Sequence, residues 1–272
     1  MGKKLNQQHE SPANIHWSED EQTIFYQGKG IQLAKVQEMC QRLVQRLVES
    51  LQELAFGLDL PRIELDQVID SMAWSPEFRK SEYSFIQHPQ NQRLNVDYQY
   101  LLDRAKEATG SRQILTCVNS QYQWIDSAKK AYLNQERQFL QKLLVGLHVT
   151  GGQPARGPEI GSIKVSYYIY TNLYTNPFFQ VFNSIYSARN LYVLNGRMCF
   201  LTTYDKAQRR RGNTEYIIRC LPDKISQILI QYLVYVRPFA RALDQRETEY
   251  LFASLQGPWA GEELKFVLSQ IT

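Results

Sequence analysis

The stretch TGGQPARGPEI, residues Thr150 to Ile160, divides the sequence into two parts of different texture. It contains three glycines and two prolines, the residues that end regular elements and form turns, and so predicts a loop. The same loop carries one arginine, Arg156, and one acid three residues later, Glu159. A leucine-rich helical pattern ends just before the loop, and a basic region rich in tyrosine, isoleucine and valine follows it. The stretch is therefore expected to be a hinge between two structural regions.

Before the hinge, the spacing of apolar residues predicts helices. Apolar side chains recur every three or four residues between Ile31 and Leu58, as on one face of a helix. Further helical patterns cover residues 96–108, which end near Gly110, and residues 120–149. We therefore expect a mobile segment at residues 1–29 and an all-helical unit of four or five helices at residues 30–148.

After the hinge, residues 149–272 combine strand and helix patterns. Two β-prone runs flank Asn195-Gly196, the strongest short signal for a β-hairpin because both residues tolerate positive φ. EYIIRCLP predicts a third strand. Helices are expected from Asp223, with a break or kink at Pro238, and over residues 261–270. The expected fold class is α+β, mainly α, with a helical bundle followed by a small antiparallel sheet with helices.

The basic residues are concentrated in one segment. Between Arg189 and Arg241 ten lysines and arginines face three acids, so this segment carries a net charge of +7 and the rest of the chain −3. Such a local field favours a polyanion such as nucleic acid. The alternative is an ordinary solvated charged surface.

Cysteines and histidines predict no metal site and no disulfide framework. No two of the four cysteines have C-x-x-C spacing, and the four histidines add no metal-ligand pattern, so reduced cysteines of an intracellular protein are expected. No apolar run approaches the ~18 residues of a membrane span, and the N-terminus has no signal-peptide pattern. We expect no cofactor, no metal and no membrane partner.

Several basic side chains are candidates for a phosphate site. The guanidinium of Arg156 can bind a phosphate with two hydrogen bonds, and Lys206, just past the second hairpin strand, can act as a proton donor. An arginine and a lysine of this kind can stabilise a pentacoordinate phosphate. The remaining expected DNA contacts are Arg197, Arg209, Arg210, Arg211 and Arg219. Alternatively, Arg156 and Glu159 form a structural ion pair and Lys206 is an ordinary exposed lysine.

The order of these pieces resembles the first two-thirds of a tyrosine recombinase catalytic domain. In that family a Thr-Gly-x-Arg-x-x-Glu element supplies a catalytic arginine and a hairpin turn supplies a catalytic lysine, which implies these roles for Arg156 and Lys206, with support from Glu159. Here additional residues separate the two glycines from Arg156. From about Asp70 to Arg237 the chain also resembles a fungal segment found upstream of telomere-linked RecQ-type helicase domains, and the recombinases of Crypton-type elements. The quoted parts of that resemblance include YSFIQHPQN, TGGQPARGPEI and RNLYVLNGRMCFLTTYDK.

This resemblance implies a mobile-element origin, DNA as partner, assembly of copies on DNA and a nuclear location. It implies a DNA-clamp-like role for residues 30–148 and a partial catalytic-like domain at residues 149–272. The family's His-x-x-Arg box and nucleophilic tyrosine have no counterpart after the hinge, since no histidine follows His148, and no Walker A motif is present. The His-x-x-Arg box and the nucleophilic tyrosine are expected to lie beyond Thr272.

Three functions remain open from the sequence. The first, which we expect, is a DNA-binding remnant of a tyrosine recombinase that is catalytically inactive alone. The second is an active recombinase completed by further residues, and the third is a domesticated protein-interaction module that does not bind DNA.

Overall fold

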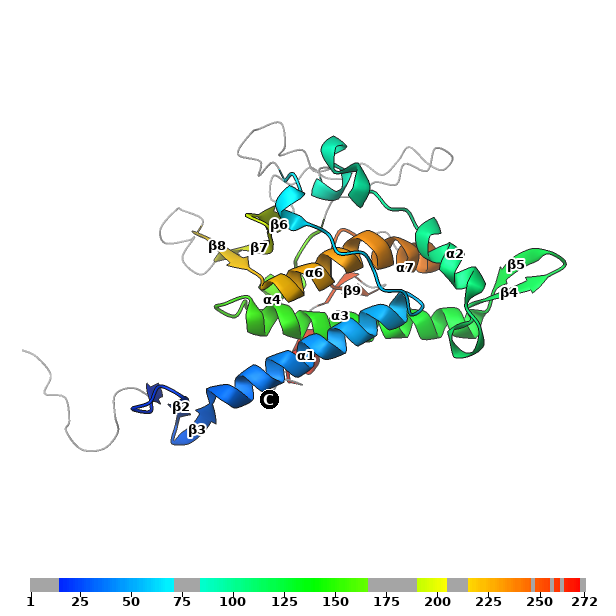
Figure 1. Ribbon diagram of the computed structural model, residues 1–272. Coiled ribbons are helices and arrows are strands. Elements are labelled where there is room, and N and C mark those ends of the chain that lie inside the picture. Colours follow the sequence, from blue (N-terminus) through cyan, green and yellow to red (C-terminus); the bar gives the residue numbers. More distant parts are fainter. Residues whose placement is uncertain are drawn as a thin grey trace, which may run out of the picture. The chain divides into compact units, whose positions relative to one another are not determined.

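The structure is a computed structural model that describes residues 15–70, 84–165, 190–204, 215–245, 248–254, 257–259 and 262–269 (Figure 1). Internal contacts divide the chain into two compact units, residues 1–45 and residues 46–272. The predicted boundary between residues 148 and 149 falls within the second unit. Helix α1, Leu33–Leu54, is continuous across the division between the units.

The described part of the first unit is a β-meander followed by the start of α1. Strands β1 (Ile15–Trp17), β2 (Thr23–Tyr26) and β3 (Lys29–Gln32) pair antiparallel in the order β1-β2-β3. No sheet is expected here from the sequence. No residue between 15 and 45 is buried, and apolar side chains such as Ile15 and Trp17 are more than half exposed. This part of the chain therefore has no core of its own.

Helices build the core of the second unit. The longest, α3 (Asp126–Thr150), buries Phe139, Leu143 and Leu147 and contacts α6 (Asp223–Gln231), α7 (Arg237–Asp244) and α8 (Glu262–Ser269). Gly146 allows a close approach, because a Cβ there would lie 3.3 Å from Leu47 and 3.4 Å from Ile225. Shorter helices are α2 (Gln99–Glu107) and α4 (Gly157–Gly161). Single 3-10 turns cover Leu65–Gln67, Phe85–Gln87 and Gly110–Arg112, and a kinked 3-10 segment covers Pro89–Leu94.

The expectation of an all-helical region at residues 30–148 is wrong at two places, at β3 and at a second hairpin. Strands β4 (Leu115–Val118) and β5 (Gln121–Trp124) form an antiparallel hairpin, which Figure 1 shows beside the start of α3. Asn119 and Ser120 between them have φ of 50° and 63°, the left-handed conformation of a two-residue hairpin turn. The helix predicted from Ser120 therefore begins only at Asp126.

The predicted hairpin after the hinge is confirmed. Strands β6 (Leu191–Leu194) and β7 (Arg197–Tyr204) pair antiparallel around Asn195 and Gly196, whose φ values are 49° and 71°. The predicted third strand is β8 (Glu215–Cys220), which pairs with the other edge of β7. A two-stranded ladder, β9 (Ala253–Ser254) with β10 (Gly257–Pro258), completes the described strands.

The predicted kink at Pro238 takes the form of a wider turn. A π-helical turn, Tyr232–Val236, joins α6 to α7, and the proline is the second residue of α7. Because proline has no N–H and its ring crowds the preceding turn, the regular helical bonding cannot continue through this point. Together these elements make a mixed fold of helices with small antiparallel sheets, which confirms the coarse fold class.

Candidate phosphate-binding site at the hinge

The hinge begins where α3 ends, beside the β6-β7-β8 sheet, since a Cβ on Gly151 would lie 3.3 Å from Phe200 on β7. The Thr150 hydroxyl donates to the Gly146 carbonyl (2.7 Å), and the Gly151 N–H donates to the Leu147 carbonyl (3.0 Å). Gly152 then has a φ of 86°, a left-handed conformation that favours glycine. This turn brings the carbonyl of Gln153 to strand β8, where it accepts a hydrogen bond from Arg219.

Arg219 connects the hinge to the sheet. Its side chain is only 4% exposed, with Nε donating to the Gln153 carbonyl (2.6 Å) and Nη1 donating to the Thr202 hydroxyl on β7. The guanidinium lies 5.7 Å from the ring centre of Phe200, its partner across the β7–β8 ladder. Burial lowers the pKa of Arg219, and the charge of Glu159 acts in the opposite direction. Because these contacts fix the Arg219 guanidinium, it holds the hinge and strand β7 in a defined arrangement.

Glu159 links Arg219 to Arg156. Its Oε2 accepts a hydrogen bond from the backbone N–H of Arg156 (3.2 Å) and lies 3.7 Å from Nη2 of Arg219. Its Oε1 lies 4.0 Å from Nε of Arg156. Glu159 is 15% exposed, whereas the Arg156 side chain is 48% exposed. The acid therefore fixes the hinge backbone from inside, and the Arg156 guanidinium extends toward solvent.

His148 is a member of this group that the sequence analysis did not select. It lies in the last turn of α3, and its Nδ1 is buried with no hydrogen-bond partner among the residues that the structure describes. Burial lowers the pKa of His148, and the charge of Arg219 lowers it further. The sequence carries no signal for this proximity, because His148 and Arg219 are far apart in the chain and come near each other only in the fold.

Half of the predicted site lies outside the described residues. Lys206, Arg209, Arg210 and Arg211 all belong to the segment 205–214, which the structure does not describe. The strand ends on either side are described: Tyr204 pairs with Glu215, two residues beyond Thr202. At about 3.4 Å per residue, the strand end at Tyr204 lies about 7 Å along β7 from Thr202, the residue that Arg219 contacts.

Arg197 lies at the other end of β7. It is exposed and follows the Asn195-Gly196 turn, five residues before Thr202. That spacing corresponds to about 17 Å along the strand. The structure therefore does not bring Arg197 together with Arg156 and Arg219.

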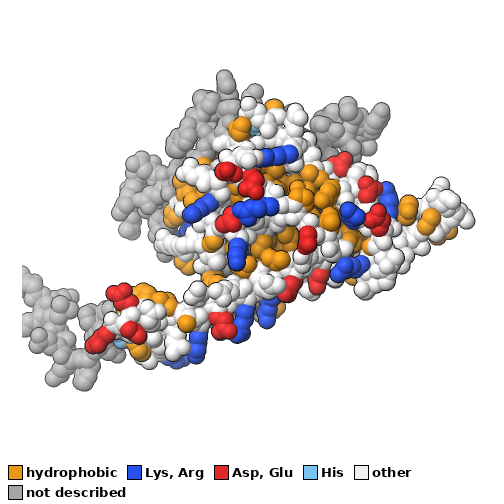
Figure 2. Space-filling view, in the orientation of Figure 1, with side chains coloured by type: hydrophobic (Ala, Val, Ile, Leu, Met, Phe, Trp, Pro, Cys, Tyr) orange, Lys and Arg blue, Asp and Glu red, His pale blue; other side chains and the backbone are white. Residues whose placement is uncertain are grey.

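The described surface carries fewer exposed basic side chains than the count for residues 189–241 suggests. Of its described members, Arg219 and Arg237 are buried, and Arg237 donates to the carbonyls of Thr248 (3.2 Å) and Tyr250 (2.8 Å). Arg241 also donates to the carbonyl of Thr248. Figure 2 shows basic and acidic side chains interspersed over one face of the molecule. A concentrated positive surface therefore depends on the residues of segment 205–214.

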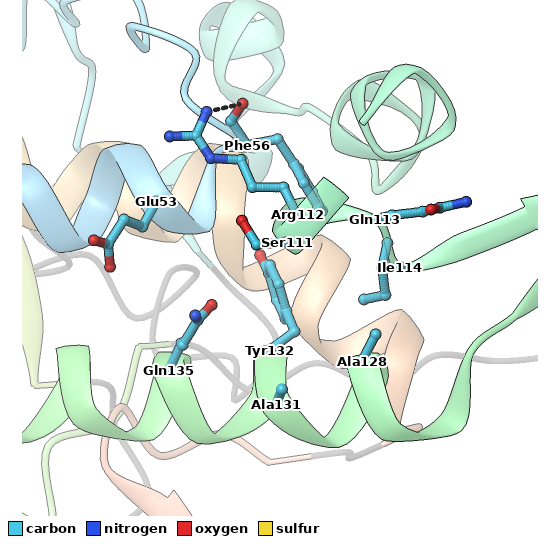
Figure 3. A pocket seen from close by; sticks show the side chains of 10 residues that line it. All are labelled: Glu53, Phe56, Ser111, Arg112, Gln113, Ile114, Ala128, Ala131, Tyr132 and Gln135. Atoms are coloured by element: carbon cyan, nitrogen blue, oxygen red, sulfur yellow. Dashed lines mark hydrogen bonds between the residues drawn. The ribbon is translucent and has the colours of Figure 1, made fainter. Parts of the chain in front are cut away.

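A pocket of about 300 Å³ lies elsewhere, between the end of α1, the Gly110–Arg112 turn and α3 (Figure 3). Arg112 donates from Nη1 to the Phe56 carbonyl (3.4 Å) at its rim, and the Tyr132 ring forms part of the wall. The Tyr132 hydroxyl is already used, since it donates to the Leu54 carbonyl (2.9 Å). None of the residues predicted for the phosphate site lines this pocket.

No protein-family model matches this sequence, and no solved structure gives a significant match to this chain. In the part of the chain that the structure describes, no helix is long and apolar enough to cross a membrane. Within the same residues, no three acids, histidines or cysteines gather as a metal site would require.

Proposed function

We propose that this chain is a tyrosine-recombinase-like DNA-binding protein of mobile-element origin, with Arg156 as a ligand of a backbone phosphate. The proposal is supported above all by the contacts of Arg219, which hold the Arg156 hinge against the strands that lead into segment 205–214. The resemblance in sequence indicates DNA as the partner. These contacts support the binding of Arg156 and of the basic residues of segment 205–214 to the same stretch of DNA.

The charge arrangement fits the backbone of DNA better than a single small anion. Arg156 extends from the hinge with 48% of its side chain exposed, and segment 205–214 adds four basic residues and one acid by sequence. Double-stranded DNA presents a dense row of phosphates, which several separate cations can contact together. The buried Arg219 acts as a positioning residue in this proposal.

The proposal covers binding and not strand cleavage. Cleavage in the recombinase family uses a His-x-x-Arg box together with a nucleophilic tyrosine, and no histidine follows His148 in this sequence. Arg156 and Lys206 alone supply phosphate contacts, which stabilise a complex without supplying the nucleophile.

Titration of the full chain with a labelled mixed-sequence duplex at several salt concentrations tests the proposal. Affinity should fall steeply as salt rises, and Arg156→Ala should weaken binding and reduce the slope of log affinity against log salt by about 1. Replacing Arg209, Arg210 and Arg211 together by alanine should reduce the slope further.

Arg104→Ala is the matched control. Arg104 is 50% exposed and pairs with an acid three residues later, as Arg156 does, but it lies on α2, away from the hinge. It should leave affinity and slope unchanged. Absence of salt-dependent binding overturns the proposal. If Arg156→Ala has no effect while the triple variant abolishes binding, the role of Arg156 is wrong and DNA binding stands.

A further inference from the structure

Cys199 on β7 and Cys220 on β8 lie directly opposite each other in the antiparallel ladder. The neighbouring pair, Met198 and Leu221, is joined by a hydrogen bond from the Leu221 N–H to the Met198 carbonyl (2.9 Å). Pairs alternate in such a ladder, so the two cysteines occupy a non-hydrogen-bonded position, where the Cα atoms are only about 4.5 Å apart and the side chains are closest. That separation lies within the range found in disulfides.

The two sulfur atoms already face each other. Sγ of Cys199 and Sγ of Cys220 are in direct contact, and neither cysteine is in a disulfide. Forming a bond between them therefore requires a small movement of side chains and leaves the strand register unchanged. This arrangement is absent from the sequence pattern, because 20 residues separate the two cysteines along the chain.

The two thiols differ in accessibility. Cys199 is fully buried, whereas Cys220 is exposed. Burial, together with the hydrogen bond to Cys220, raises the pKa of Cys199 to about 12. A reagent in solution therefore meets Cys220 first, and Cys199 stands behind it as the second thiol.

We propose that Cys199 and Cys220 form a dithiol site that low-molecular-weight disulfides, such as oxidised glutathione, convert to a cross-strand disulfide. In the first step Cys220 loses its proton to solvent, and its Sγ attacks the glutathione disulfide, which releases one glutathione thiolate. In the second step the proton of Cys199 passes to solvent, its Sγ attacks Sγ of Cys220, and the second glutathione leaves as a thiolate. The two released thiolates take up the two protons. The protein is oxidised by two electrons, and one glutathione disulfide is reduced to two thiols.

The geometry favours the second step over a stable mixed disulfide. The high pKa of Cys199 slows its attack, because the thiolate is the nucleophile. The position of Cys199 directly across the ladder offsets this, since a group held beside its target reacts as if at very high concentration. The inference does not depend on DNA binding, although the site lies next to the Phe200–Arg219 pair.

Cys117 provides an internal control in the same chain. It is also exposed and lies on a hairpin strand, β4, but its partner across the ladder is Tyr122. Glutathione on Cys117 therefore has no thiol opposite to displace it. Cys117 should accumulate as the mixed disulfide under conditions in which Cys220 does not.

The test is oxidation of the reduced full-length chain by a series of glutathione buffers, followed by alkylation in denaturant and peptide mass spectrometry. The expected product is a peptide pair joined through Cys199 and Cys220, with glutathione on Cys117. In Cys199→Ser, Cys220 should instead keep glutathione, as Cys117 does. The proposal is overturned if wild-type Cys220 retains glutathione to the same extent as Cys117, or if both Cys199 and Cys220 remain fully alkylated after Cys117 is oxidised.

Discussion

Arg219→Ala should destabilise the second unit strongly, because it removes the cation that joins the hinge to the sheet. The side chain is 4% exposed and has three partners: the carbonyl of Gln153, the hydroxyl of Thr202 and the carboxylate of Glu159. Removing one member of a buried charged group costs about 3–5 kcal/mol. The Glu159 side chain is 15% exposed, so water can solvate its carboxylate in the variant. We therefore expect a loss at the lower end of that range, about 3 kcal/mol.

That loss corresponds to a roughly hundredfold rise in the unfolding equilibrium constant, since about 1.4 kcal/mol changes an equilibrium tenfold. Urea unfolding followed by circular dichroism and by tryptophan fluorescence measures it, with Trp259 as a buried reporter that is 2% exposed. Arg219→Lys keeps the charge but loses the planar fork of donors, so it should fall between wild type and the alanine variant.

Arg197→Ala is the control, since Arg197 lies on the same strand pair but is exposed. It should change the free energy of unfolding by no more than about 0.5 kcal/mol, as exposed substitutions usually do. If Arg219→Ala is as mild as Arg197→Ala, Arg219 does not hold the hinge and the reasoning is refuted.

Three further substitutions test other parts of the structure. The pKa of His148 is lowered on folding, so the unfolded chain takes up the proton at a higher pH than the folded chain does. The free energy of unfolding should therefore fall as pH drops below about 6.5. His148→Gln should reduce that dependence in melting curves between about pH 8 and pH 5. Gly161→Ala places a Cβ too close to the carbonyl oxygen of Trp259, so it should lower the free energy of unfolding by about 1–3 kcal/mol and lower the melting temperature. Gly157→Ala is the control, because its Cβ would lie 3.8 Å from the nearest atom. Equal effects of the two substitutions would contradict this packing. Tyr232→Phe removes the hydroxyl that donates to the buried Glu136 (2.7 Å) and should cost about 1–3 kcal/mol in urea unfolding, while an unchanged midpoint would mean that the carboxylate has sufficient other donors.

Local signals in the sequence predicted local structure well. The Asn195-Gly196 hairpin was predictable because its turn depends on two adjacent residues that tolerate positive φ. The hairpin at Asn119 and Ser120 was missed because its turn has no glycine and the helical pattern of α3 runs into it. The end of α3 and the start of the hinge were visible from Gly151 onward.

The candidate site was predictable only as a set of residue types. A count of charges treats every arginine as exposed, so it could not distinguish the buried Arg219 and Arg237 from the exposed Arg197. Nor could it place His148 beside Arg219, since that proximity depends on contacts between residues far apart in the chain. The opposed pair of cysteines is likewise a product of strand register.

Helix α1 has a consequence for amide hydrogen exchange. Its first half, up to Gln45, contains no buried residue, whereas its second half buries Leu47, Leu51 and Leu54. Both halves are helical, but only the second half must lose packed apolar contacts when its backbone hydrogen bonds open. Protection should therefore rise along a single unbroken helix, from near that of an isolated peptide at Leu33 to that of the core at Leu54. The residue near Gln45 at which amide protection rises would mark the first residue of the cooperatively unfolding core.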